Sequence, residues 1–106
     1  MLIRDATAGD FERILQLNEE SVHFLSPLTL ARLQSLHADS AYHRVVDVDG
    51  KVAGVLLAFR EGTSYDSSNY FWFTKNYDQF LYIDRVVVSK DFQGQGIGNK
   101  LYDDIF

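Results

Sequence analysis

The chain has 106 residues, 46% of them hydrophobic and 14% aromatic, which suits one domain over residues 1–106 with a single core. It contains no cysteine, which excludes a disulfide framework, a thiolate nucleophile and cysteine metal ligation, and its formal net charge of −5 argues against nucleic acid or an acidic membrane as the main partner. No apolar run approaches the ~20 residues of a membrane-spanning helix, and the first residues lack the apolar region of a signal peptide, so we expect a cytoplasmic protein.

The first third of the chain predicts a strand and two helices. Residues 2–4 form a short strand, and Thr7 with Asp10 resembles a capping box in which aspartate replaces the usual glutamate. Ser26 and Pro27 are expected to begin the second helix as its N-cap and first helical residue. The buried stripes are expected to hold Phe11, Ile14, Leu15, Val22 and Leu25 in the first helix and Leu30, Leu33 and Leu36 in the second.

The rest of the chain predicts three more strands and a third helix. Residues 42–48 and 51–59 are valine-rich strands joined at Asp49-Gly50, a strong signal for a two-residue hairpin turn. Residues 61–78 are expected to form a loop with a short helical turn at 70–74. The last elements are a strand from residue 80 or 81 to residue 88 and a helix with Ile97, Leu101 and Ile105 on one face.

Residues 86–101 hold the most informative pattern, in which a run of valines leads into three closely spaced glycines and an amphipathic helix. Gly94, Gly96 and Gly98 carry no Cβ, so the backbone can adopt positive φ and approach a ligand closely. The helix N-terminus adds unpaired N–H donors and partial positive charge, so the pattern predicts a phosphate site. A structural loop without a ligand is the alternative.

The spacing of the glycines separates three phosphate-binding motifs. A P-loop is excluded because Gly98 is followed by Asn99 and not by Lys-Ser or Lys-Thr. A dinucleotide fingerprint fits poorly, since the third glycine comes one residue too early. The order Gln93-x-x-Gly96-x-Gly98 resembles the loop of the GNAT superfamily of acetyl-CoA-dependent N-acetyltransferases.

The resemblance covers nearly the whole chain and is nearest to a group of small bacterial acetyltransferases. It is carried by residues 17–19, 26–28, 65–73 and 82–85. It implies an α+β GNAT fold, with a mostly antiparallel sheet, flanking helices and the order β-α-α-β-β-β-α. Because family domains continue beyond this point, it also implies that the chain is the N-terminal two-thirds of a domain. The fourth strand would then have an unpaired edge, which favours a homodimer or other self-association.

The resemblance also implies the chemistry and the cofactor residues. The cofactor would be acetyl-CoA, the acceptor a small-molecule or peptide amine that attacks directly, and no metal would take part; a non-catalytic coenzyme-A-binding module or an inactive fragment is the alternative. Pantetheine would meet the backbone of Val86, Val87 and Val88, and pyrophosphate would meet Gln93, Gly94, Gln95, Gly96, Ile97, Gly98 and Asn99. His23, His37 and His43 lack metal-ligand spacing and are expected to be structural or exposed.

Strand alternation gives the catalytic candidates. Tyr82, Asp84, Val86 and Val88 are expected to share one face of the fourth strand. Asp84 would then lie beside the acetyl group as a base or an ammonium anchor, with Tyr82 as a second catalytic candidate. An ion pair with a nearby cation is the alternative for Asp84.

Four further residues are candidates for substrate contact. Asn18 interrupts the apolar stripe of the first helix, so we expect it to face the core or a pocket, and Glu19 follows it. Helix capping or solvent exposure is the alternative for this pair. Tyr70 and Trp72 belong to an aromatic segment that either cages a cationic amine or covers the open side of the sheet.

Overall fold

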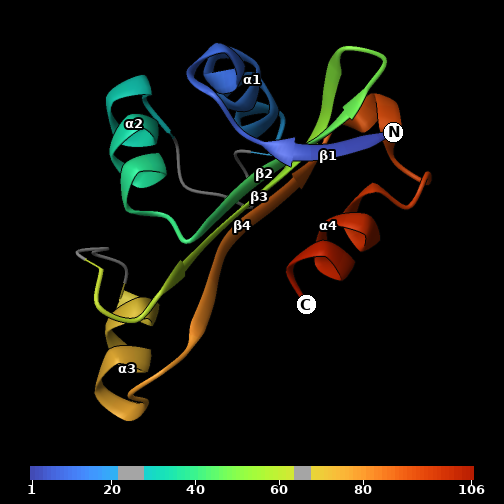
Figure 1. The fold of residues 1–106 in the computed structure, drawn as a ribbon. Helices are drawn as coiled ribbons and strands as arrows, with labels where there is room; N and C mark the ends of the chain where they lie inside the picture. The colour runs from blue at the N-terminus through green and yellow to red at the C-terminus, as the bar shows by residue number, and fades with distance from the viewer. Residues whose placement is uncertain (22–27, 64–67) are drawn as a thin grey trace.

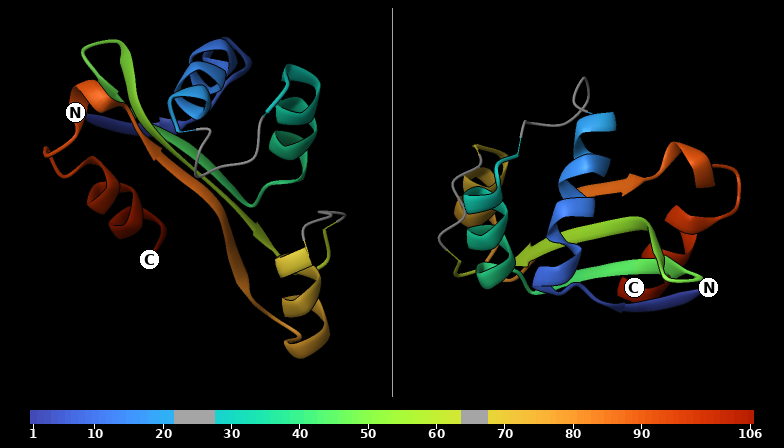
Figure 2. Two further views of the ribbon diagram at one scale, coloured as in Figure 1. Left: turned by 180° about the vertical axis from the view of Figure 1, so that it is seen from behind. Right: turned by 90° about the horizontal axis from the view of Figure 1, so that it is seen from above.

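The computed structural model describes residues 1–21, 28–63 and 68–106, and these form a four-stranded antiparallel sheet with helices on both faces. Helices α1 and α2 cover one face, α4 packs against the other, and α3 lies beyond one end of the sheet (Figures 1 and 2). The elements are β1 (Leu2–Asp5), α1 (Phe11–Glu20), α2 (Leu30–Asp39), β2 (Tyr42–Val48), β3 (Lys51–Arg60), α3 (Ser68–Asn76), β4 (Leu81–Val88) and α4 (Ile97–Ile105). This is the predicted α+β architecture.

The strands follow the order β1-β2-β3-β4. Residues 52–59 of β3 are all buried, because β3 lies inside the sheet and helices cover both of its faces. The turn from β2 to β3 has Asp49 at a φ of 53° and Gly50 at a φ of 85°, the left-handed conformations that a two-residue hairpin requires. The predicted hairpin is therefore confirmed, with β3 one residue longer than expected.

The predicted capping residues begin the first helical segment. Asp10 ends a 3-10 turn that leads into α1, and its carboxylate accepts the Thr7 N–H over 2.8 Å. The same carboxylate accepts two hydrogen bonds from Arg4, over 2.7 and 2.9 Å, and Arg4 lowers the pKa of Asp10 to about 2. The inward side of α1 holds Phe11, Ile14 and Leu17, with Leu15 partly buried. Val22 and Leu25 lie outside the described residues.

The start of α2 corrects the prediction. The helix begins at Leu30, and its N-cap is Thr29, whose hydroxyl oxygen accepts the N–H of the residue three positions later over 3.1 Å. Ser26 and Pro27, the predicted start, lie outside the described residues. Leu30 is 49% exposed and does not face inward. It is the first residue of α2, and the helix meets the core only further along, at its later leucines. The other two predicted positions, Leu33 and Leu36, are buried.

Helix α3 replaces most of the predicted loop, so the order becomes β-α-α-β-β-α-β-α. Tyr70 anchors it: the ring is buried, and the hydroxyl donates to the Arg60 carbonyl and accepts the Thr63 N–H over 3.1 Å. Phe71 and Trp72, which follow on the same helix, are about half exposed. Tyr70 therefore anchors the helix through a buried ring and its hydrogen bonds, and such an anchor leaves no periodic pattern in the sequence.

Helix α4 approaches β3 closely at Gly54. A Cβ on Gly54 would lie 2.7 Å from Ile97 Cγ2 and 3.2 Å from the Val87 carbonyl oxygen, so glycine permits this contact. Ile97 and Leu101 are buried and Ile105 is partly buried, which confirms the predicted face. The contact holds the start of α4 next to the end of β4.

Candidate active site

The glycine loop joins the end of β4 to the start of α4. Gly94 at a φ of 82° and Gly96 at a φ of 76° adopt the left-handed conformation, and Gly96 is the N-cap of α4. The first hydrogen bond of the helix runs from the Lys100 N–H to the Gly96 carbonyl over 3.0 Å. The N–H groups of residues 97–99 lie before this bond and have no acceptor within the helix, so an anion can use them as donors. A Cβ on Gly94 or Gly96 would meet nothing within 4 Å, so the loop is open on that side. This geometry fits a pyrophosphate group.

Ser89 fixes the stem of the loop. It is fully buried, and its N–H donates to the Ala53 carbonyl of β3 over 2.8 Å. Its hydroxyl oxygen accepts the Asp91 N–H and one guanidinium N–H of Arg13, each over 3.3 Å. Ser89 is not among the residues predicted from the sequence; a serine two residues before an aspartate at the end of a strand is the turn signal that marks it.

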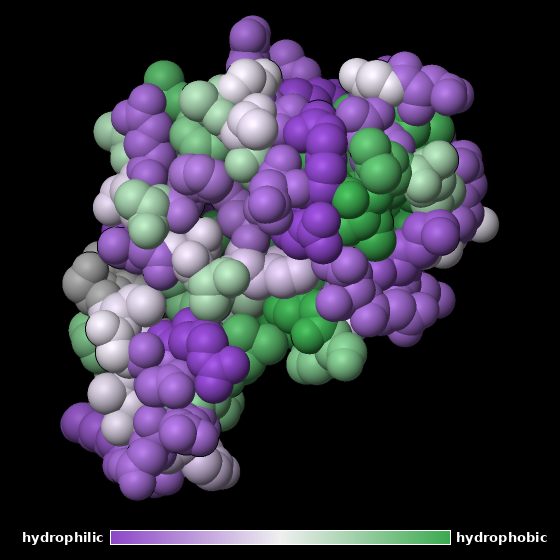
Figure 3. All heavy atoms as spheres, in the orientation of Figure 1, coloured by the Kyte–Doolittle hydropathy of each residue, from purple (hydrophilic) through white to green (hydrophobic). Residues whose placement is uncertain are grey.

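The outer edge of β4 is open beside this loop. Strand β4 pairs with β3 on one side, and no strand within the described ranges pairs with its other edge. Val86 and Val88 are partly buried on the side of α4, whereas Val87 is buried on the side of α1. Hydrophobic surface is visible in the region between the sheet and α4 (Figure 3). Within the described residues, the outer edge of β4 therefore combines apolar side chains with backbone N–H and C=O groups that no neighbouring strand pairs.

A β-bulge in β4 corrects the predicted alternation. Neighbouring residues 57 and 58 of β3 pair with Arg85 and Ile83, so Asp84 has no partner in β3. The face of the sheet that α4 covers holds the side chains of Ile83, Val86 and Val88. The opposite face holds those of Tyr82 and Val87. The predicted face that joined Tyr82 and Asp84 to the two valines is wrong, because the extra residue in the bulge shifts the alternation by one position.

Asp84 forms a buried ion pair that reaches α1. The Nε of Arg85 donates to the Asp84 carboxylate, and the two side chains are 9% and 5% exposed, respectively. Nη1 of Arg85 donates to Oδ1 of Asn18 over 2.8 Å. Asn18 is buried, as expected, and the ion-pair alternative describes Asp84; its part in catalysis stays a prediction.

Solved structures with the same fold include several acetyltransferases. A protein from Bacillus halodurans is 21% identical, with a TM-score of 0.69 over 99% of this chain and 72% of its own. The ribosomal-protein-alanine N-acetyltransferase of Brucella melitensis is 20% identical, with a TM-score of 0.69 over 99% and 64% of the two chains. The aminoglycoside antibiotic 6′-N-acetyltransferase of Acinetobacter haemolyticus is 16% identical, with a TM-score of 0.68 over 98% and 68%. No curated protein matches the sequence.

The sequence pattern of the acetyltransferase (GNAT) family matches residues 3–106. The chain belongs to this family. It spans 64–72% of the length of the three similar structures. The family assignment agrees with the predicted fold and with the glycine loop, and it leaves the acceptor of this GNAT domain open.

The remaining candidates of the GNAT domain lie in two regions. Glu19 is exposed on α1, next to the buried Asn18. The partly buried Tyr82 ring lies 5.9 Å from the ring of Tyr70, which is itself part of the core. Trp72 is 54% exposed, and its ring centroid lies 5.1 Å from that of its neighbour in α3. The burial of Tyr70 favours the packing alternative for that residue, whereas Trp72 is accessible to a ligand.

Two of the histidines pack together between α2 and β2. Their Nδ1 atoms, on His37 and His43, lie 2.7 Å apart, and Phe11 contacts both rings. Burial, with a smaller contribution from His37, lowers the pKa of His43 to about 4, and Asp10 acts weakly in the opposite direction. His23 lies outside the described residues. Within the described residues, no three histidine, aspartate or glutamate side chains are placed to hold a metal.

This pair predicts a loss of stability in mild acid. Because the pKa of His43 is about 4 in the folded protein and 6.5 in the unfolded chain, the contribution of neutral His43 is complete above pH 6.5 and is lost as the pH falls toward 4. The loss should reach about 3 kcal/mol, at 1.36 kcal/mol per pKa unit. Urea denaturation at several pH values measures it, and His43→Phe should flatten the dependence between pH 6.5 and 4. An equally steep profile in that variant would contradict the assignment.

Within the described residues, no helix combines the length and apolar character needed to cross a membrane. The cytoplasmic location of this GNAT domain stays a prediction.

Proposed function

We propose that this chain is an acetyl-CoA-dependent N-acetyltransferase domain that modifies the amine of a small molecule or peptide. The observation that best supports this proposal is the glycine loop that follows β4. Two of its glycines adopt the left-handed conformation with open space beside them, and the first N–H groups of α4 follow directly. When bound, acetyl-CoA supplies the thioester carbonyl that the amine attacks. The chain's family membership supports this assignment.

The cofactor residues divide into two groups. The loop donors of residues 93–99 would hold the pyrophosphate, because backbone N–H groups at a helix N-terminus suit an anion without a cationic side chain. The open edge of β4 would bind the amide-containing pantetheine arm through the backbone of Val86, Val87 and Val88. Partly buried apolar side chains on the α4 side of this edge support the second assignment.

We assign Asp84 the role of ammonium anchor or base, with Tyr82 near it on the strand. The bulge displaces Asp84 from the regular pairing, and Arg85, which also donates to Asn18, positions its carboxylate. Glu19 and Trp72 are exposed candidates for contact with the amine. A non-catalytic coenzyme-A-binding module is the second candidate function, because the Asp84 side chain is 5% exposed and already paired.

Acetyl-CoA turnover with a panel of amines tests the function, and Asp84→Asn tests the role. We expect the variant to lower kcat by at least about a hundredfold, the lower range of general-base effects, with unchanged coenzyme A affinity. Asp78→Asn removes one exposed carboxylate elsewhere and should keep the wild-type rate. Coenzyme binding without turnover for any amine would favour the binding module, and an unaffected kcat in Asp84→Asn would make the aspartate structural.

The open edge of β4 also supports self-association, since an unpaired strand edge can pair with another chain. Pantetheine and a second copy would compete for this edge. We therefore expect light scattering to show a dimer that coenzyme A shifts toward monomer. A monomer at all concentrations without coenzyme A would contradict the proposed association.

A further inference from the structure

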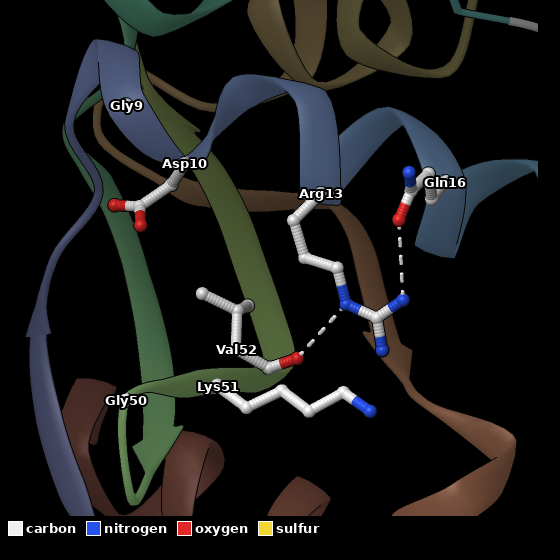
Figure 4. A pocket seen from close by; sticks show the side chains of 7 residues that line it. All are labelled: Gly9, Asp10, Arg13, Gln16, Gly50, Lys51 and Val52. Atoms are coloured by element: carbon white, nitrogen blue, oxygen red, sulfur yellow. Dashed lines mark hydrogen bonds between the residues drawn. The ribbon is translucent and has the colours of Figure 1, made fainter.

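A polar pocket lies apart from the open edge of β4. It has a volume of about 440 Å³ and is formed by the first turns of α1 and the turn between β2 and β3 (Figure 4). Its polar wall includes Arg13 from α1 and Lys51 from the first position of β3. Neither residue takes part in the cofactor or acceptor sites proposed above.

Arg13 is held in place by neutral groups. Its Nε donates to the Val52 carbonyl and its Nη2 to the Ser89 hydroxyl, both over 3.3 Å, and its Nη1 donates to the Gln16 side chain over 3.4 Å. Other arginines contact carboxylates, as Arg4 does with Asp10 and Arg85 with Asp84. Arg13 is therefore fixed at the pocket wall by neutral acceptors, in a chain with 15 acidic and 10 basic side chains.

Lys51 adds a second positive charge to the same pocket. Within the described residues it has no carboxylate within ion-pair distance, and its Nζ lies 5.9 Å from the centroid of the Phe92 ring. The Arg13 guanidinium and the Lys51 ammonium lie toward the same side of the pocket (Figure 4). Two cationic side chains therefore line one pocket.

The carboxylate in the pocket wall does not neutralise them. Asp10 accepts both of its short ionic hydrogen bonds from Arg4, over 2.7 and 2.9 Å. Its carboxylate points away from Arg13 and Lys51 (Figure 4). The acidic residue that lines the pocket is therefore already paired with Arg4.

We propose that this pocket is an anion site that binds a phosphate group through Arg13 and Lys51. Guanidinium and ammonium groups together match the oxygens of a phosphate, and Arg13 is already oriented by its three neutral contacts. Ser89 and Phe92, which contact the two cations, belong to the stem of the glycine loop, so the pocket adjoins that stem. The proposal rests on the pocket alone and not on acetyl transfer.

Titration of the full chain with inorganic phosphate, followed by backbone amide NMR, tests the site. We expect saturable shifts at residues 50–52, and an affinity at least about tenfold weaker in Arg13→Gln and in Lys51→Gln, since each removes one charge-assisted hydrogen bond. The double variant Arg60→Gln, Lys75→Gln matches the charge change of the pocket double variant and should bind as the wild type does. No saturable shifts, or equal affinity in wild type and the Arg13, Lys51 double variant, would overturn the proposal.

A second arm distinguishes two sources of the phosphate. Coenzyme A and dephospho-coenzyme A are compared by calorimetry in wild type and in Lys51→Gln, which leaves the Arg13 contacts in place. If the coenzyme's own 3′-phosphate occupies the pocket, the preference for coenzyme A disappears in the variant. If a separate phosphorylated ligand occupies it, the preference stays the same while inorganic phosphate binding is lost. Both outcomes support the site, and unchanged phosphate binding in Lys51→Gln opposes it.

Discussion

Replacing Gly96 by valine is expected to weaken coenzyme A binding by at least about tenfold while the fold persists. Gly96 adopts a φ of 76°, which costs a side-chain-bearing residue roughly 1–2 kcal/mol, and about 1.4 kcal/mol already corresponds to tenfold in affinity. Its Cβ would enter the open space beside the loop, where we propose that pyrophosphate binds. The valine therefore disturbs the loop conformation and obstructs the site at once.

The matched control is Gly62→Val. Gly62 has a φ of 83°, and a Cβ there also meets nothing within 4 Å, so this variant introduces the same kind of backbone strain outside the loop. Calorimetry measures the coenzyme affinity of both variants, and circular dichroism verifies their folds. Wild-type affinity in Gly96→Val, or an equal loss in Gly62→Val, would contradict the assignment of the loop as the pyrophosphate site.

Replacing Arg85 by alanine should lower the free energy of unfolding by about 3–5 kcal/mol, the cost of removing one member of a buried ion pair. The Asp84 carboxylate is 5% exposed and forms an ion pair with Arg85, which also donates to Asn18. The variant therefore removes the cation of the ion pair and one hydrogen-bond donor to the buried Asn18 amide. Urea denaturation measures the loss.

Arg60→Ala is the control for this variant. Arg60 is 56% exposed in its pair with Glu61, and exposed pairs contribute at most about 1 kcal/mol. The double variant Asp84→Asn, Arg85→Ala should recover part of the stability, because asparagine no longer buries a carboxylate charge beside the missing guanidinium. If Arg85→Ala costs no more than Arg60→Ala, the pair is not the anchor between β4 and α1.

Local chemistry made the hairpin and the glycine loop predictable. Asp49-Gly50 specifies its turn because few residues adopt left-handed φ, and the same rule places Gly94 and Gly96 before α4. These signals extend over a few residues. They depend on backbone conformation and on hydrogen bonds to near neighbours, which the order of residues shows directly.

Contacts between distant segments account for what the sequence did not show. The bulge at Asp84 arises from the pairing of β3 with β4, and the Arg85–Asn18 contact joins residues 67 positions apart. Tyr70 anchors α3 through a carbonyl at the end of β3, and Arg13 meets Ser89 across 76 positions. Such contacts exist because the sheet brings remote strands together, and their energy comes from burial and long-range hydrogen bonds, for which no short pattern in the chain is a signature.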